Sequence, residues 1–304
     1  AGELVRAGWG VLVVDKGRGV GGRVASRRIG EVAFDHGAQF VTARTPRFAA
    51  WLDAARGVDV AREWCRGFNG DADAHPRWRG QPAMTALAKH LARGLAIELE
   101  QQVAALRQDG EGWQVETVAG GVRRAGILVL TSPVPQSLAL LEAGGVTLDE
   151  AVRARLERVD YERCLAVMAV LDGPSRLPGP GGLAPPDSRI AWIADNWQKG
   201  ISAVPSVTLH GGHDFSLQHW DRDRQEAGGL LLEAARPWLG AGASVFQVHG
   251  WRFGRPMQTL DEGCLVASAR PLLVLAGDAF SEPRVEGAVV SGWAAAEAVL
   301  ARAS

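Results

Sequence analysis

Residues 10–23 read GVLVVDKGRGVGGR, a short apolar run that ends at an acidic residue and continues into a glycine-rich loop. Continuous apolar, β-branched runs are typical of strands that are buried on both faces of a parallel sheet. Residues 127–131 (ILVLT) and 272–276 (LLVLA) have the same character, far away in the sequence. With the helical patterns at 85–95 and 285–301, they predict an α/β fold in which three separate segments form one sheet.

Composition limits the function classes. The chain has 304 residues, of which 47% are hydrophobic and 22% charged, which fits about two globular domains. A net charge of −1 provides no basic surface for nucleic acid or for an anionic membrane, so a small-molecule substrate is the favoured partner. The three cysteines form no CxxC pair, and neither a disulfide framework nor a zinc site is indicated. No membrane span or signal peptide is recognisable, so a cytoplasmic location is expected.

The middle of the chain has a different pattern. Residues 96–118 predict a hairpin around the turn at 109–112 (DGEG). A helix is predicted over 222–239, where apolar residues recur at helical spacing. Further strands, interrupted by a Pro/Gly-rich stretch, are predicted at 164–171, 189–195, 204–210 and 244–253. These elements indicate a second, mainly antiparallel sheet with a covering helix.

The first chemical signal follows the apolar run at 11–14. Asp15 closes this predicted strand, and at the carboxyl edge of a parallel sheet a carboxylate can accept hydrogen bonds from ribose hydroxyls. The loop that follows holds four glycines and three cations, of which Arg23 could pair with a phosphate while glycine backbone approaches an anion closely. The alternatives are an acidic residue that starts a loop and a solvated, glycine-rich turn.

A second signal lies near the other end of the chain. Residues 274–278 (VLAGD) lead into a predicted helix rich in small residues from position 285. Gly277 would let backbone pass close to a ligand, Asp278 could bind a hydroxyl, and the start of a helix favours negative charge. The alternative is a strand–helix crossing that needs glycine for packing alone.

Together these motifs resemble the flavin-containing amine oxidase superfamily. The residues that carry the resemblance are DKGRGVGGR at 15–23, FDHGAQF at 34–40, and the GDAF and VEGA elements within 275–293. Within the superfamily the chain is similar to the renalase-like bacterial branch, through RWRGQPAM (77–84), IADN (193–196), VTLH (207–210) and GWR (250–252). The motifs are specific as a set and weak singly.

The resemblance implies an FAD cofactor. Asp15 would bind the adenosine ribose, and Val103 would pair its backbone with the adenine. Residues expected near the pyrophosphate or the ribityl chain are Lys16, Gly21, Gly22, Arg23, Gly277 and Asp278. Residues expected along the pyrimidine edge of the flavin are Glu286, Gly287 and Ala288, while His36, Gly37, Ala38 and Gln39 would approach the isoalloxazine ring from the other side.

The resemblance also implies a domain organisation. A discontinuous Rossmann-like FAD-binding domain would comprise residues 1–45, 96–140 and 266–304, and a mainly antiparallel β substrate domain would comprise 46–95 and 141–265. The chain opens on residues 1–8, which resemble the end of the helix that follows the family's GxGxxG loop. Either the natural sequence starts further upstream, or the product binds FAD poorly.

The reaction that the resemblance implies is oxidation of a dihydronicotinamide isomer, with hydride passing to flavin N5 and electrons then to oxygen. The residues expected to shape the pocket are Asn196, His210, Trp251 and Arg252, each with a purely structural role as the alternative. Rival interpretations are an ordinary amine oxidase and a flavin-free scaffold. Lys199 is placed in a polar loop and is given no catalytic role. A metal site is not predicted, because the spacing of His210, His213 and His219 fits no tetrahedral pattern.

Overall fold

The computed structural model describes residues 1–68 and 71–302; positions 69–70 and 303–304, which fall in the predicted substrate and FAD-binding domains, lie outside the described residues. The chain divides into two compact units, each built from separate segments. Unit 1 comprises Ala1–Val20, Leu91–Tyr161 and Arg255–Ser304, and unit 2 comprises Gly21–His90 and Glu162–Gly254.

Parallel strands form the centre of unit 1. β1 (Leu12–Val14) pairs in parallel with β6 (Ala96–Glu98). β10 (Ile127–Leu130) pairs in parallel with β17 (Leu272–Leu275), and β16 (Leu265–Ala269) joins β17 on its other edge in antiparallel orientation. The predicted parallel strands are therefore present, and the fold is α/β with a Rossmann-like part.

One expectation about this sheet is wrong. The apolar runs at 127–131 and 272–276 share a sheet, but the run at 10–14 does not join them. Among the described residues β1 pairs with β6 alone, and a ladder forms only between strands about 4.8 Å apart. The same pairing corrects the predicted hairpin at 96–118: Ala96–Glu98 belongs to the parallel pair, and the hairpin consists of β7 (Val103–Asp109) and β8 (Gly112–Thr117).

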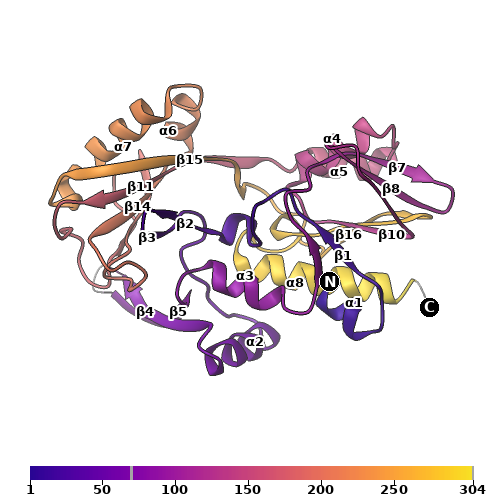
Figure 1. Cartoon of the computed structure of the whole chain (residues 1–304), viewed down its shortest axis with the longest axis horizontal. Helices are drawn as coiled ribbons and strands as arrows, with labels where there is room; N and C mark the ends of the chain where they lie inside the picture. The colour runs from indigo at the N-terminus through magenta and orange to yellow at the C-terminus, as the bar shows by residue number, and fades with distance from the viewer. Residues whose placement is uncertain (69–70, 303–304) are drawn as a thin grey trace. The chain divides into compact units, whose positions relative to one another are not determined.

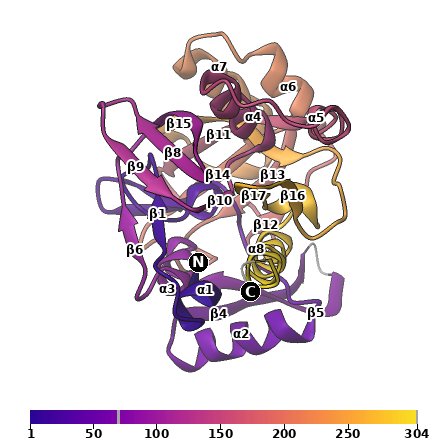
Figure 2. The ribbon, with the colours of Figure 1, turned by 90° about the vertical axis from the view of Figure 1, so that its right-hand side faces the viewer.

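Helix α8 (Val285–Leu300) packs against the β17 strand. Its buried residues Gly287, Ser291 and Ala295 recur every four positions, so small side chains form one face of the helix. The core here joins Val274 of β17 to Ala295, and the short α1 helix (Gly2–Arg6) contributes Leu4. Figures 1 and 2 show α1 beside α8. The carboxyl end of β17 thus leads through η2 (Asp278–Phe280) into a helix that lies against the same strand.

The rest of unit 1 consists of a three-stranded antiparallel sheet and two helices. β9 (Val122–Ala125) extends the β7–β8 hairpin to three strands. Two helices follow β10: α4 (Val134–Ala143) and α5 (Glu150–Glu157). Asp149 begins α5, because its side chain accepts hydrogen bonds from the Ala151 and Val152 amides.

A five-stranded sheet dominates unit 2, and the predicted second, mainly antiparallel sheet is thereby confirmed. Its order is β12-β13-β14-β11-β15, and the pairs β12–β13, β13–β14 and β14–β11 are antiparallel. Helices α6 (His213–Gln218) and α7 (Arg224–Leu239) cover it, as Figure 1 shows, and α7 packs its apolar face on the sheet through Ala227, Leu231 and Ala235. The strands are β11 (Tyr161–Leu171), β12 (Gly182–Leu183), β13 (Ile190–Asp195), β14 (Ser206–Gly211) and β15 (Ala243–Pro256).

Unit 2 also contains two hairpins and two helices. η1 (Gly22–Val24) leads into the hairpin of β2 (Ser26–Ile29) and β3 (Val32–Asp35), while β4 (Ala61–Phe68) pairs with β5 (Asp71–Gly80). The helices are α2 (Pro46–Gly57) and α3 (Thr85–Leu91), the latter shorter than the predicted 85–95 because a turn follows Ala92. By its contacts segment 21–45, predicted to lie with the FAD-binding domain, falls in unit 2.

Candidate functional site

Four candidate residues of unit 1 follow the carboxyl ends of parallel strands: Asp15 and Lys16 after β1, and Gly277 and Asp278 after β17. Asp15 directly follows β1 and is half-buried, and its Oδ1 accepts a hydrogen bond of 2.7 Å from the Gly17 amide. Its own backbone is fixed by the β6 side, because Asp15 N donates to the carbonyl of Glu98. Lys16 is exposed. A carboxylate is thus held at the strand end by a turn that needs only neighbouring residues.

The Gly277–Asp278 turn follows β17, whose four residues are all buried. Gly277 has φ 141° and ψ −176°, a conformation that residues with a Cβ rarely adopt. Its amide donates to Ser291 Oγ of α8 at 2.8 Å, which joins the turn to the helix. A Cβ at Gly277 would meet only the Thr131 carbonyl, at 4.0 Å, so the space beside this glycine is open. Asp278 is buried, with 7% of its surface exposed.

The first turn of α8 holds the other predicted residues of this end. Glu286 and Gly287 are buried, whereas Ala288 is exposed. Gly287 packs so closely on the Glu282 backbone that a Cβ would overlap the Glu282 carbonyl oxygen. Val103 lies apart from this turn in sequence and opens β7, where it pairs with Thr117. Close packing therefore explains the glycine at position 287. At Gly277, by contrast, the backbone borders open space that a ligand could occupy.

The candidate residues of unit 2 centre on segment 36–39, which follows β3. Ala38 N donates to the Arg23 carbonyl at 2.9 Å, and a Cβ on Gly37 would overlap that same oxygen. Gly21 and Gly22, before Arg23, have φ of 126° and 51°. Arg23 Nη1 donates to the Gly254 carbonyl at 3.1 Å. The structure thus places the glycine–arginine loop against segment 36–39.

Two of the four predicted pocket residues meet at His36. The His36 carbonyl accepts hydrogen bonds from Trp251 Nε1 at 2.8 Å and lies 3.2 Å from His210 Nε2. The other two lie elsewhere. Asn196 is fully buried and bonds Thr208 at 3.2 Å, and Arg252 is exposed, since neighbouring residues of a strand point to opposite faces.

The His36 ring lies in an aromatic cluster. His249 and Trp251, two residues apart on β15, each have a ring centroid 5.0 Å from that of His36. Burial, with nearby cationic and histidine side chains, lowers the pKa of His36 to about 3. Burial likewise lowers the pKa of His210 to about 4 and that of His249 to about 4. All three imidazoles are therefore neutral at pH 7, and the buried His36 Nδ1 has no hydrogen-bond partner in the structure.

One functional feature was missed by the sequence interpretation. Lys199, expected in a polar loop, is buried with its side chain 0% exposed, and its Nζ lies 2.7 Å from Asp35 Oδ2. It also donates to Gln39 Oε1 at 3.3 Å and lies 4.9 Å from the centroid of the Trp64 ring. Burial lowers the pKa of this ammonium group, and Asp35 opposes that effect. The available signal was its rarity: it is one of three lysines in an arginine-rich chain.

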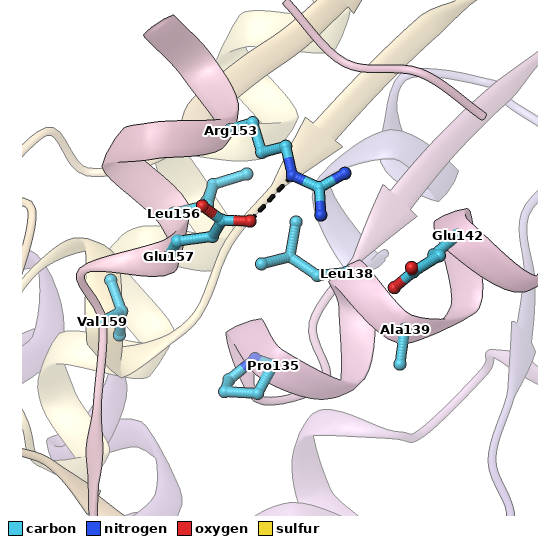
Figure 3. Close-up of a pocket in the computed structure, with 8 residues that line it drawn as sticks. All are labelled: Pro135, Leu138, Ala139, Glu142, Arg153, Leu156, Glu157 and Val159. Atoms are coloured by element: carbon cyan, nitrogen blue, oxygen red, sulfur yellow. Dashed lines mark hydrogen bonds and ion pairs between the residues drawn. The ribbon is translucent and has the colours of Figure 1, made fainter. Parts of the chain in front are cut away.

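A cavity of about 290 Å³ lies elsewhere in unit 1, between α4 and α5 (Figure 3). Its wall is apolar except for Glu142 and the Arg153–Glu157 ion pair, whose atoms lie 2.7 Å apart. The predicted site residues do not line it. The lining residues are Pro135, Leu138, Ala139, Glu142, Arg153, Leu156, Glu157 and Val159.

Neither a metal centre nor a membrane span is found among the residues that the structure describes. No three His, Cys, Asp or Glu side chains of this part of the chain come together as a metal site. His213, for example, accepts the Arg163 amide through Nδ1 at 3.0 Å. No helix in the described ranges has both the length and the apolar character that crossing a bilayer requires.

Comparison with known families connects these features. Residues 68–300 match the family described as flavin containing amine oxidoreductase, which is more than half of the chain. The chain belongs to the flavin-containing amine oxidoreductase family. Residues 1–55 of this family member also match an NAD(P)-binding Rossmann-like domain. The resemblance seen in the sequence motifs is thereby confirmed.

Individual relatives of this flavin-containing amine oxidoreductase are distant. Renalase of Mus musculus is 23% identical over 209 residues, which cover 65% of this chain and 61% of renalase, so the chain spans less than two thirds of that protein. Wild-type putrescine oxidase bound to putrescine has a TM-score of 0.73 at 14% identity, covering 99% and 96% of the two chains. A fatty acid isomerase from P. acnes, producing CLA, reaches 0.66 at 12% identity, covering 99% and 94%. These structures share the fold.

The residues of unit 1 fit a flavin nucleotide. A carboxylate at the end of β1 suits ribose hydroxyls, and the open space beside Gly277 allows a ligand to approach the backbone. Asp278 and Glu286 add carboxylates next to that backbone, one before and one within the first turn of α8. The observed geometry is thus compatible with the roles that the resemblance implies.

Proposed function

We propose that the chain is an FAD-dependent oxidoreductase of renalase-like type that oxidises a small reduced substrate, such as a dihydronicotinamide isomer, with oxygen as the acceptor. The observation that carries the proposal is the placement of Asp15 and the Gly277–Asp278 turn at the carboxyl ends of parallel strands, in a member of a flavin-containing family. When bound, the flavin would supply an acceptor for the substrate hydride, and the two electrons, with two protons, would then reduce oxygen to hydrogen peroxide.

In this proposal the chain's own residues bind and orient rather than exchange protons. Asp15 would hold the ribose, while the backbone at Gly277 would lie along the cofactor and Asp278 beside its hydroxylated chain. In unit 2, segment 36–39 would face the isoalloxazine ring, with its backbone fixed by Arg23, His210 and Trp251. Positioning of the donor carbon is the main requirement for hydride transfer.

The protonation states in unit 2 support a hydride donor over an amine. The imidazoles of His36, His210 and His249 have pKa values of about 3 to 4, so they are weak bases at neutral pH. The Lys199 ammonium is paired with Asp35. Oxidation of a dihydropyridine needs no strong base, because the nitrogen lone pair assists departure of the hydride and the product is aromatic.

The test uses the purified protein. It is mixed with FAD and, separately, with FMN, freed of excess, and examined by visible absorption. The loaded protein is then mixed anaerobically with dihydro isomers of nicotinamide adenine dinucleotide and, in parallel, with putrescine. We expect retention of FAD and bleaching by a dihydronicotinamide. Retention with bleaching by the amine alone would replace the proposal by amine oxidation, and failure of the protein to retain any flavin would overturn it.

A further inference from the structure

The buried Lys199–Asp35 pair joins three distant parts of unit 2. Asp35 ends β3, Lys199 lies in the loop after β13, and Met84 precedes α3. Asp35 Oδ2 receives the lysine at 2.7 Å, while its Oδ1 accepts the Met84 amide at 2.9 Å and Ser26 Oγ at 2.6 Å. Every carboxylate oxygen is thus hydrogen-bonded, as a buried charge requires.

The same lysine reaches the predicted flavin-facing segment through Gln39. Lys199 Nζ donates to Gln39 Oε1 at 3.3 Å, which fixes the orientation of the side-chain amide. The other end of that amide, Nε2, donates to the Asp35 carbonyl at 2.5 Å and to the Gly37 carbonyl at 3.1 Å. The Gln39 side chain therefore bridges the backbone carbonyls of Asp35 and Gly37, and the hydrogen bond from Lys199 orients the Gln39 amide.

The Lys199 side chain has a geometry that serves this purpose. The Lys199 amide donates to the Asp195 carbonyl at 2.9 Å, and Gly200 follows with φ 77°, so a tight turn directs the residue. The Trp64 ring, whose centroid lies 4.9 Å from Nζ, adds a cation–π contact to the ammonium group. A buried, paired lysine of this kind is not needed for stability alone, since apolar side chains of similar volume often serve as well.

We propose that Lys199 is a positioning residue: through Gln39 and Asp35 it sets the backbone conformation of segment 36–39. The effect of that conformation on a bound flavin rests on the proposed function, whereas the effect on the segment itself does not. Lys199 contacts neither substrate nor cofactor in this scheme.

The test compares hydrogen exchange in peptides that cover residues 36–41 of the whole chain, without added flavin. The variants are Lys199→Met, Gln39→Leu and the charge-balanced Asp35→Asn/Lys199→Met, with Lys89→Met on the exposed side of α3 as the matched control. We expect Gln39→Leu and the charge-balanced variant to exchange about tenfold faster in this segment, the factor for loss of one ordinary hydrogen bond. Lys89→Met should exchange at the wild-type rate.

The outcomes separate positioning from charge neutralisation. If the charge-balanced variant exchanged as slowly as the wild type, Lys199 would only compensate Asp35, and the proposal would be overturned. Wild-type exchange in Gln39→Leu would overturn it as well. Gln39→Leu removes no charge, so it stays informative if Lys199→Met does not fold. Where FAD is retained, the absorption maximum of the flavin should differ between Gln39→Leu and the wild-type protein. Faster exchange in a protein that takes up no flavin would leave the positioning role intact and defeat the proposed function alone.

Discussion

Asp15 and Asp35 each stand at the end of a strand, yet their surroundings differ. Asp15 is half-buried, and its carboxylate binds an amide two residues away. Asp35 is fully buried, and its carboxylate partners lie 9, 49 and 164 residues away. A carboxylate held by a local turn is open to a ligand, whereas one held from three directions organises the protein around it.

The largest effect on stability is expected from a substitution that breaks the buried Lys199–Asp35 pair. Lys199→Met would leave the Asp35 carboxylate uncompensated in the interior, which costs about 3–5 kcal/mol of unfolding free energy. The measurement is urea-induced unfolding. The matched control is Arg236→Met in the ion pair with Glu233 on α7, whose side chains are 76% and 68% exposed, and there the midpoint should not change. Equal midpoints for the two variants would contradict the contrast between buried and exposed pairs.

Gly37→Ala would disturb the backbone of segment 36–39, to which the Lys199–Asp35 pair is linked through Gln39. The new Cβ would overlap the Arg23 carbonyl oxygen, so segment 36–39 or the loop at 21–23 must move, at a cost of about 3 kcal/mol. Thermal unfolding measures it. Gly229→Ala on α7 is the control, because a Cβ there meets nothing within 4 Å, and its melting temperature should rise slightly. A stable Gly37→Ala protein would show that this close approach is easily relaxed.

The same contrast explains which parts of the fold were predictable. The strands at 127–130 and 272–275 and helix α7 have apolar patterns that depend on neighbouring residues alone, and their positions were correctly inferred. The partner of β1 was not. Ala96–Glu98 is a three-residue strand without a pattern of its own, and its pairing with β1 joins segments more than eighty residues apart.

The candidate site divides in the same way. Asp15 and the Gly277–Asp278 turn were found at strand ends because sequence order alone places them there. Lys199 was assigned to a polar loop, and its neighbours Trp197, Gln198 and Gly200 are exposed in the structure. Only Asp35, far away in the sequence, explains its burial. A buried ion pair of this kind leaves no local periodicity from which it could be inferred.

A pH titration sharpens the comparison at the histidine cluster of unit 2. Burial lowers the pKa of His36 to about 3 and those of His210 and His249 to about 4, whereas unfolded histidine has a pKa of about 6.5. The unfolded chain therefore binds more protons below about pH 6.5, and stability should fall from there down to about pH 4, by about 1.4 kcal/mol per pH unit for each histidine. Unfolding free energies measured across this range test it.

Single substitutions identify the histidines responsible for that slope. His249→Gln removes one buried imidazole and should reduce the slope by about one third, the share of one group among three. Val245→Ala, at an exposed position of the same strand that carries no titratable group, should leave it unchanged. If the slope of unfolding free energy against pH were the same in His249→Gln as in the wild type, groups other than His249 would cause the acid sensitivity.

The smallest effect on stability is expected at Asp15, the half-buried aspartate of the pair compared above. Asp15→Asn retains an oxygen for the Gly17 amide, so unfolding free energy should change by less than about 1 kcal/mol. The lost charge would weaken a hydrogen bond from a ribose hydroxyl, and FAD should be retained about tenfold less tightly, as for loss of a charge-assisted bond. Equilibrium dialysis against FAD measures this, with Asp109→Asn at the exposed end of β7 as the control. Unchanged retention of FAD would mean that Asp15 only stabilises its local turn and does not bind the cofactor. Asp15 and Asp35 would then differ in burial but not in ligand binding.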